Sequence, residues 1–148
     1  MVTDVHLVES GLSPDRALAA FAGAHPVAGG IASFIGKVRP DDGVERLELS
    51  HYGPLTLPGM EALAAAALGR WALDGILIHH RIGQMQPGEA IVLVAAAARH
   101  RRDAFAAADF AMDHLKSEAW FWKRELRSGK WLWIEPRDED HLDLKRWK

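Results

Sequence analysis

The sequence contains no cysteine among its 148 residues. Disulfides, thiolate zinc sites and a cysteine nucleophile are therefore excluded, and any sulfur chemistry must use sulfur from a partner or a cofactor. Long apolar runs are also missing, because AIVLVAAAA at 90–98 is far shorter than the roughly 20 residues of a membrane span. The first ten residues lack a basic segment followed by an apolar run, so we expect no signal peptide and a cytoplasmic protein.

The chain also lacks a large excess of positive or negative charge. The formal net charge is -2, which argues against a surface that grips nucleic acid as a whole but leaves room for a local basic pocket. No HExxH spacing and no glycine-rich phosphate loop occur, and the neighbours His79 and His80 would point to opposite faces of a strand. We therefore expect no metal site.

The length predicts one domain spanning residues 1–148, with 136–148 as a mobile tail or a short helix. Hydrophobic periodicity and turn residues predict an α+β fold with a mostly antiparallel sheet. The expected strands are 5–9, 29–39, 44–52, 76–83 and 90–98, the expected helices are 13–23, 60–73 and 101–115, and hairpins are expected over 29–52 and 120–135. Residues 40–43 and 84–89 are expected to be turns, and 53–59 a loop.

Three local details sharpen these expectations. Gly36 inside a strand pattern predicts a bulge or a close backbone approach, and Gly23 is expected to end the first helix, which Ser13 would cap and Pro14 would open. The helix at 101–115 is expected to bury one face, formed by Phe105, Ala108, Met112 and Leu115.

Cations gather at the ends of the expected elements. His100, Arg101 and Arg102 open the helix at 101–115, where the helix dipole disfavours cations unless an anion binds there. They form either a phosphate or carboxylate cradle or a group of solvated side chains, and spacing alone favours the second.

Lys116 and Lys123 lie seven residues apart, on either side of Trp120, Phe121 and Trp122. If the aromatic residues begin a strand, a bend brings the two lysines together, and each ammonium then lowers the pKa of the other. An amine tuned in this way acts as an acid, base or nucleophile near neutral pH. The alternative is a surface pair beside an aromatic core cluster, which spacing alone again favours.

Several runs together resemble the large, catalytic subunit of molybdopterin synthase, the MoaE family. The runs are GGIASFIGKVR at 29–39, LELSHY at 47–52, IHHRIGQMQPGE at 78–89, ARHRRDAF at 98–105 and MDHLKSEAWFWKRE at 112–125. They follow the family's order and spacing and cover roughly residues 28–135, so that together they are specific although each alone is weak.

The resemblance implies an α/β hammerhead fold with an added antiparallel subdomain. It implies a sulfurtransferase that moves sulfur from the C-terminal thiocarboxylate of a small ubiquitin-like, MoaD-like subunit to cyclic pyranopterin monophosphate. The product is the dithiolene of molybdopterin, in molybdenum cofactor biosynthesis. The implied assembly is a homodimer within a heterotetramer, with no cofactor of its own, no nucleic acid and no membrane.

The resemblance also implies the site. Lys116 and Lys123 match the family's two active-site lysines; Lys116 would stabilise charge that develops at the thiocarboxylate, and Lys123 would transfer protons. The full set of expected substrate-binding residues is Lys37, Val38, Arg39, His100, Arg101, Lys116, Lys123, Arg124 and Glu125.

The chain departs from the family pattern in four places, one of which is Ser50 before His51 and Tyr52, where the family has glutamate. Ser117–Trp120 stands where the family usually has threonine, arginine, alanine and proline; the loop at 53–59 is longer, and the turn after Arg39 is shorter. Two alternatives to the enzyme therefore remain: a non-catalytic homologue that docks a ubiquitin-like tail, and a binder of a phosphorylated ligand.

Overall fold

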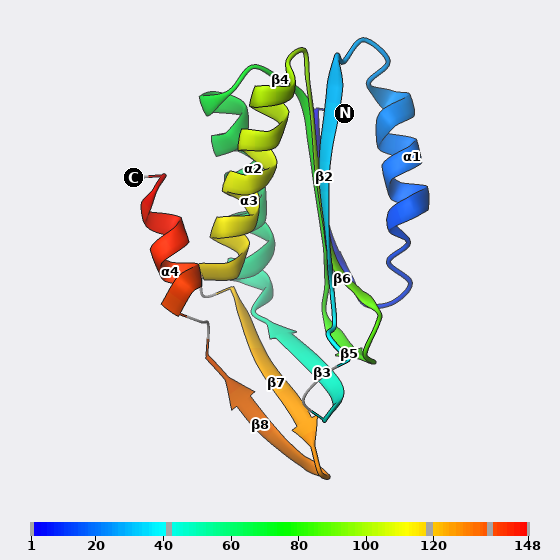
Figure 1. Cartoon of the computed structure of the whole chain (residues 1–148), viewed down its shortest axis with the longest axis vertical. Helices are drawn as coiled ribbons and strands as arrows, with labels where there is room; N and C mark the ends of the chain where they lie inside the picture. Colours follow the sequence, from blue (N-terminus) through cyan, green and yellow to red (C-terminus); the bar gives the residue numbers. More distant parts are fainter. Residues whose placement is uncertain (1, 41–42, 118–119, 136–137, 148) are drawn as a thin grey trace.

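The computed structural model describes residues 2–40, 43–117, 120–135 and 138–147. These residues form eight strands and four helices (Figure 1). In chain order they are β1 (Thr3–Val8), α1 (Pro14–Ala24), β2 (Gly30–Lys37), β3 (Val44–His51), α2 (Gly53–Arg70), β4 (Leu73–Arg81), β5 (Gly83–Met85), β6 (Ala90–Ala98), α3 (Arg101–Ser117), β7 (Phe121–Arg127), β8 (Lys130–Ile134) and α4 (Asp138–Lys145). The expected α+β class is confirmed.

The first sheet has the strand order β1-β4-β6-β2 and is covered on both faces (Figure 1). Helix α1 packs on one face, against Leu77 and Leu93, while α2 and α3 pack on the other, around Ile76, Ile78 and Val94. Strand β6 reads as a continuous apolar run, as do residues 76–78 of β4, because both faces of the sheet are buried there. The described part of the chain has no helix that is both long and apolar enough to cross a bilayer.

The second sheet has the order β5-β3-β7-β8 and extends beyond the end of the first (Figure 1). Strands β7 and β8 form the expected hairpin. Ser128 and Gly129 connect them with φ values of 49° and 74°, the left-handed pair that a two-residue turn between twisted strands requires.

The hairpin expected over 29–52 is wrong. β2 pairs with β6 in the first sheet, whereas β3 pairs with β5 and β7 in the second. The connection therefore passes from one sheet to the other; residues 41–42 of the expected turn lie outside the described part. The irregularity at Gly36 is confirmed, since the β2–β6 register shifts there and an added Cβ would lie 2.8 Å from Val92 Cγ1.

The loop expected at 53–59 is also wrong, because these residues form the first turns of α2. Pro54 lies in the first turn, where its missing N–H is not needed. Thr56 closes the start of the helix: its hydroxyl accepts a hydrogen bond from the Tyr52 N–H (3.3 Å) and donates one to the Trp120 carbonyl (2.6 Å). These bonds hold a proline-containing segment, with Pro58 inside it, as a helix.

Three smaller expectations need correction. Gly23 does not end α1, which continues to Ala24, and Gly83–Met85, part of which was expected to be a turn, pairs with β3 as β5. Phe105 is 66% exposed rather than buried, because the buried side of α3 is centred on Ala104, Ala107 and Ala111.

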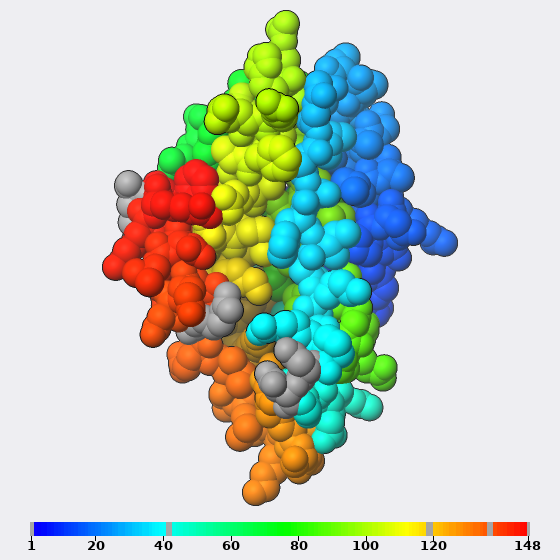
Figure 2. Space-filling model, viewed as in Figure 1, coloured from blue at the N-terminus to red at the C-terminus, as the bar shows by residue number. Residues whose placement is uncertain are grey.

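The tail forms the short helix, one of the two alternatives. After α4, Arg146 binds Asp109 and Asp113 of α3 (both 2.7 Å), and the Trp147 ring packs edge-on against Trp71 and Phe110. Figure 2 shows this segment, in red, lying against α3 in yellow.

Candidate functional site

Lys116 and Lys123 lie at one end of the first sheet, which we call the lysine end. α3 stops at Ser117 and β7 starts at Phe121, so the expected change from helix to strand between the two lysines is confirmed (Figure 1). Lys116 is an exposed residue of the last helical turn. Lys123 is half-buried, between Leu49 of β3 and Ile134 of β8 in the sheet.

A buried histidine forms part of the lysine end. His80 stacks on Phe121 with ring centroids 4.1 Å apart, and its Nδ1–H donates a hydrogen bond to the Arg81 carbonyl (2.9 Å). The pKa of His80 is lowered from 6.5 to about 4, mainly because the ring is buried; the hydrogen bond to the Arg81 carbonyl opposes this shift, and the positive charge of Lys116 adds to it. His80 is therefore neutral at pH 7 and leaves Nε2 as an acceptor.

Sequence reasoning considered His80 only as a metal ligand and missed this position. The available signal was the strand pattern itself: of two adjacent histidines in a strand that is buried on both faces, at least one must lie in the interior. His79 and His80 do point to opposite faces, as expected.

The GKVR run joins the lysine end from β2. Val38 is buried in a small cluster with Leu47, Leu49 and Met85, and Phe121 packs against the same cluster. The Val38 N–H donates to the Glu89 carbonyl (2.9 Å). Lys37 and Arg39 are exposed on either side of this anchor. The structure thus brings Lys37–Arg39 from the first sheet to the lysine end, next to β3 and β7 of the second sheet.

Arg124 and Glu125 do not lie together. Alternation along β7 places Lys123 and Glu125 on the face of Leu49, and Arg124 on the opposite face. The Arg124 Nε–H donates to Glu48 (2.6 Å), and its guanidinium lies over the Trp131 ring at 4.3 Å. This hydrogen bond from Arg124 is the main reason that the pKa of Glu48 lies below its usual value. A substrate-binding role for Arg124 stays a prediction, and it would compete with the ion pair to Glu48.

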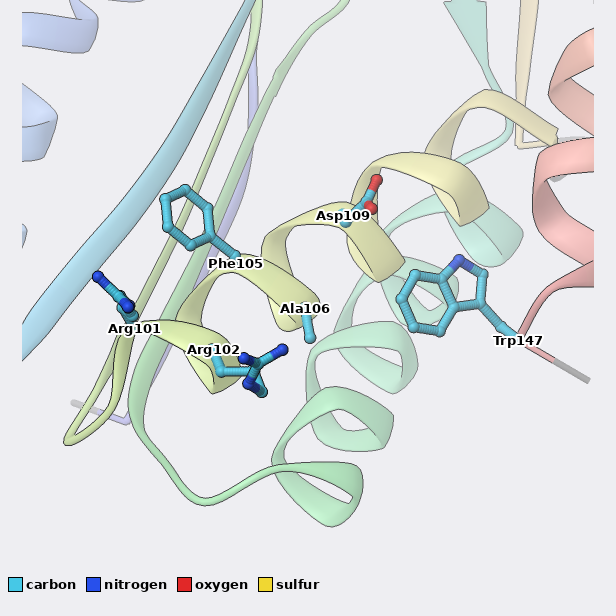
Figure 3. Close-up of a pocket in the computed structure, with 6 residues that line it drawn as sticks. All are labelled: Arg101, Arg102, Phe105, Ala106, Asp109 and Trp147. Atoms are coloured by element: carbon cyan, nitrogen blue, oxygen red, sulfur yellow. The ribbon is translucent and has the colours of Figure 1, made fainter.

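His100 and Arg101 lie at the opposite end of α3, which we call the arginine end. From Arg101 to Lys116 the helix advances 1.5 Å per residue, so the two backbone positions are about 22 Å apart. Figure 3 shows a pocket beside this end, with a volume of about 520 Å³, which Arg101, Arg102, Phe105 and Trp147 help to line. Within one copy of the chain, His100 and Arg101 therefore do not meet Lys116 and Lys123.

The two ends suit different tasks. The arginine end offers guanidinium groups and the free N–H groups of a helix N-terminus, which together suit an anion such as phosphate. The lysine end offers two amines and a neutral imidazole beside packed aromatic rings, which suit proton transfer and the stabilisation of developing charge.

Comparison with known proteins identifies relatives along most of the chain. The family model described as MoaE protein matches residues 7–118. The molybdopterin synthase catalytic subunit of Caulobacter vibrioides is 43% identical over 144 residues, which cover 97% of this chain and 96% of that protein. That of Ralstonia nicotianae is 40% identical over 146 residues, which cover 97% and 83%. The solved molybdopterin biosynthesis MoaE protein of Burkholderia ambifaria superposes with a TM-score of 0.84 at 38% identity, over 98% of this chain and 97% of that one.

Proposed function

This chain belongs to the MoaE protein family, and from that premise we propose that it is the catalytic subunit of a molybdopterin synthase. It transfers sulfur from the C-terminal thiocarboxylate of a small ubiquitin-like subunit to cyclic pyranopterin monophosphate. The observation that carries the proposal is the lysine end, where two lysines of the motif flank a helix-to-strand bend beside a buried histidine. The sulfur arrives on the partner, so that a chain without cysteine is sufficient.

The residues at the lysine end suggest how the work is divided. Exposed Lys116 is positioned to meet the inserted tail and to stabilise negative charge at its thiocarboxylate. Half-buried Lys123 is the better candidate for moving protons at the pterin, because its surroundings exclude part of the solvent. Neutral His80 keeps additional positive charge away from the two amines.

In this proposal the substrate phosphate binds at the arginine end, but within one copy of the chain that end lies far from the lysine end. A homodimer resolves this separation. β2 is an edge strand of the first sheet, and its ends, Gly30 beside Arg101 and Lys37 beside the lysine end, are about 23 Å apart at 3.3 Å per residue. A two-fold contact along β2 would place the Gly30 end of one copy beside the Lys37 end of the other. Each site would then combine one copy's lysines with its partner's His100 and Arg101.

The surface along β2 supports this contact. Phe34 is 46% exposed and Phe105 66% exposed, and Ile31 and Ile35 are exposed on the same strand. Phe34, Phe105 and Met112 line a second hollow between β2 and α3, and Figure 2 shows these two elements side by side on the surface. Exposed apolar side chains that gather along an unpaired strand edge mark an interaction surface.

A second apolar area beside the lysine end suits the small subunit. Trp122 and Trp133 are both exposed on the hairpin β7–β8. Curated relatives of this chain are named catalytic subunits, which implies an assembly with a further subunit. We assign the cytoplasm to this assembly as part of the same proposal.

The decisive test is reconstitution. The purified chain is mixed with a thiocarboxylated small subunit and cyclic pyranopterin monophosphate, and molybdopterin is quantified as its fluorescent oxidation product. Product from the wild type supports the proposal, provided that Lys116→Ala and Lys123→Ala lose most of it. Lys145→Ala, at an exposed lysine of α4, is the matched control and keeps full activity.

A docking homologue without activity is the second candidate, and one observation favours it. Trp120, where the family usually has proline, lies against Gly59 of α2, so that an added Cβ there would approach the indole to 2.6 Å. A proline in place of Trp120 could not make this contact. The absence of product despite measurable binding of the small subunit would select this candidate.

A further inference from the structure

Three potential metal ligands meet on the face of the first sheet that is opposite to His80. Asp4 and His6 lie two residues apart on β1 and share a face, and His79 of β4 is the register partner of His6 in the parallel pair β1–β4. His6 Nε2 lies 3.0 Å and His79 Nε2 2.9 Å from the same oxygen, Asp4 Oδ1. One ligand atom of each residue lies within 4.8 Å of those of the other two.

The cluster lies on the α1 side of the sheet. Val5 and Leu7 of β1 point the other way, into the core with α2 and α3, as His80 does next to His79. His79 is mostly covered, with 14% of its side chain exposed, whereas His6 is 65% exposed. The cluster therefore has a fixed inner ligand and an outer side that solvent reaches.

We propose that Asp4, His6 and His79 bind one divalent transition-metal ion of the zinc class. Two imidazole nitrogens and a carboxylate oxygen form a common zinc ligand set, and imidazole also suits nickel and copper, whereas magnesium and calcium prefer oxygen ligands. The expectation of no metal site rested on sequence spacing, which cannot detect ligands that two strands 75 residues apart bring together.

The geometry requires little movement. Ligand atoms about 2.1 Å from a tetrahedral zinc ion are roughly 3.4 Å apart, so the two nitrogens need to retreat from Asp4 Oδ1 by only a few tenths of an ångström. The His6 and His79 rings are already 5.1 Å apart and nearly perpendicular, at 76°. Water completes the coordination from the exposed His6 side.

A buried cation on the same face of β4 is paired with a carboxylate. Arg81, two residues after His79, gives its guanidinium to Glu89 (2.9 Å) and to the Gln84 carbonyl (3.1 Å). The repulsion that a bound cation meets from this direction is therefore reduced.

The ion would link the edge strand β1 to its neighbour β4, because two ligands come from β1 and one from β4. It would stabilise the folded chain without entering sulfur transfer, since His80 and the lysine end lie across the sheet. This role is independent of the proposed function, and its test needs no enzymatic assay.

The test is zinc binding by the tag-free, full-length chain after dialysis against a chelator. Isothermal titration with ZnCl₂ is expected to give one site per chain, and Co²⁺ in its place is expected to give the visible absorption bands of a tetrahedral ion. His6→Ala, His79→Ala and Asp4→Asn should each weaken zinc binding by roughly tenfold or more. Zinc should raise the melting temperature of the wild type and not that of the three variants.

The control is His141→Ala, an exposed histidine of α4 outside the cluster, which should bind zinc as the wild type does. His6→Ala removes an exposed side chain and is expected to fold, so that a loss of binding there cannot be attributed to unfolding. Circular dichroism of the metal-free variants checks this. The proposal is overturned if the wild type binds no zinc, or if the three variants bind it as tightly as the control.

Discussion

The lysine end and the arginine end of this molecule are both basic, yet they are built differently. At the lysine end, Val38, Phe121 and His80 are packed or buried around the start of β7, the strand that carries Lys123. At the arginine end, His100 and Arg101 are exposed at a helix N-terminus beside an open pocket. This difference fits the proposed division of roles, in which the lysine end acts on bonds and the arginine end binds an anion.

The largest expected effect comes from removing an amine at the lysine end. Lys116→Ala or Lys123→Ala is expected to lower kcat by about 10²–10⁴-fold, with a smaller change in KM, because the loss of a group that stabilises charge or moves protons raises the barrier. Steady-state kinetics of the reconstituted synthase measure both constants. A rise in KM with unchanged kcat would mean that the lysines bind substrate and do not act in the chemical step. The two ends would then have the same kind of role.

The next effect concerns the stability of the lysine end. Folding lowers the pKa of His80 from 6.5 to about 4, so the unfolded chain binds the proton more tightly. The stabilisation is complete above pH 6.5 and is lost as the pH falls towards 4, by about 3 kcal/mol. Urea denaturation should show this fall in the wild type and a much smaller one in His80→Gln.

The comparison for that measurement is His141→Gln, which changes an exposed histidine. Its unfolding free energy should follow the wild-type pH dependence. Equal pH dependence in His80→Gln would mean that other groups dominate the acid sensitivity.

Arg101→Ala tests the arginine end and should have a smaller effect on catalysis. Loss of a charge-assisted hydrogen bond to phosphate is expected to raise KM by about tenfold to a hundredfold and to leave kcat nearly unchanged. Arg16→Ala, an exposed arginine of α1, is the control.

The same variant decides whether the ends meet across a dimer. If they do, mixed dimers of Arg101→Ala and Lys123→Ala contain one intact site, so exchange of subunits should restore about a quarter of wild-type activity at limiting substrate. Mixtures that stay as inactive as their components would show that each copy works alone.

The smallest expected effect is on stability. It tests whether the contact between Trp120 and Gly59 outweighs the general preference of a helix for alanine over glycine. Gly59→Ala should destabilise the chain by about 1–3 kcal/mol, since its Cβ would overlap the Trp120 indole. Gly69→Ala in the same helix meets no atom within 4 Å and should stabilise it by up to about 1 kcal/mol. Thermal melts of both variants test the pair; stabilisation by both would mean that Trp120 is readily displaced.

Local sequence signals predicted most elements but not all of their partners. The apolar run at 90–98, the helix at 101–115 and the hairpin over 120–135 were recognisable because periodicity and turn residues act over a few positions. The pairing of β2 with β6 was not, since the hydrophobic pattern of β2 suits any neighbour and only the assembled sheet selects one. The start of α2 was missed because two prolines suggest a loop, while Thr56 finds its partner 64 residues away.

The candidate site shows the same difference between what local sequence patterns predict and what the assembled fold determines. Lys116, Lys123 and Lys37–Arg39 were chosen from motifs, and the fold brings them to one end. Arg124 was grouped with Lys123 although neighbours on a strand face opposite ways, and the distance to His100 and Arg101 depends on the length of α3. The sequence could identify the basic groups, but their distribution between two ends is a property of the assembled sheets.

The order of the strands along the chain has a consequence for how the protein is made. All four strands of the first sheet lie before residue 99, whereas the second sheet is incomplete until β7 and β8 at 121–134 have been synthesised. As the chain leaves the ribosome from its N-terminus, the first sheet can form while β3 still lacks β7. The lysine end is therefore completed later than the first sheet, and β3 lacks its β7 partner until translation has passed the hairpin.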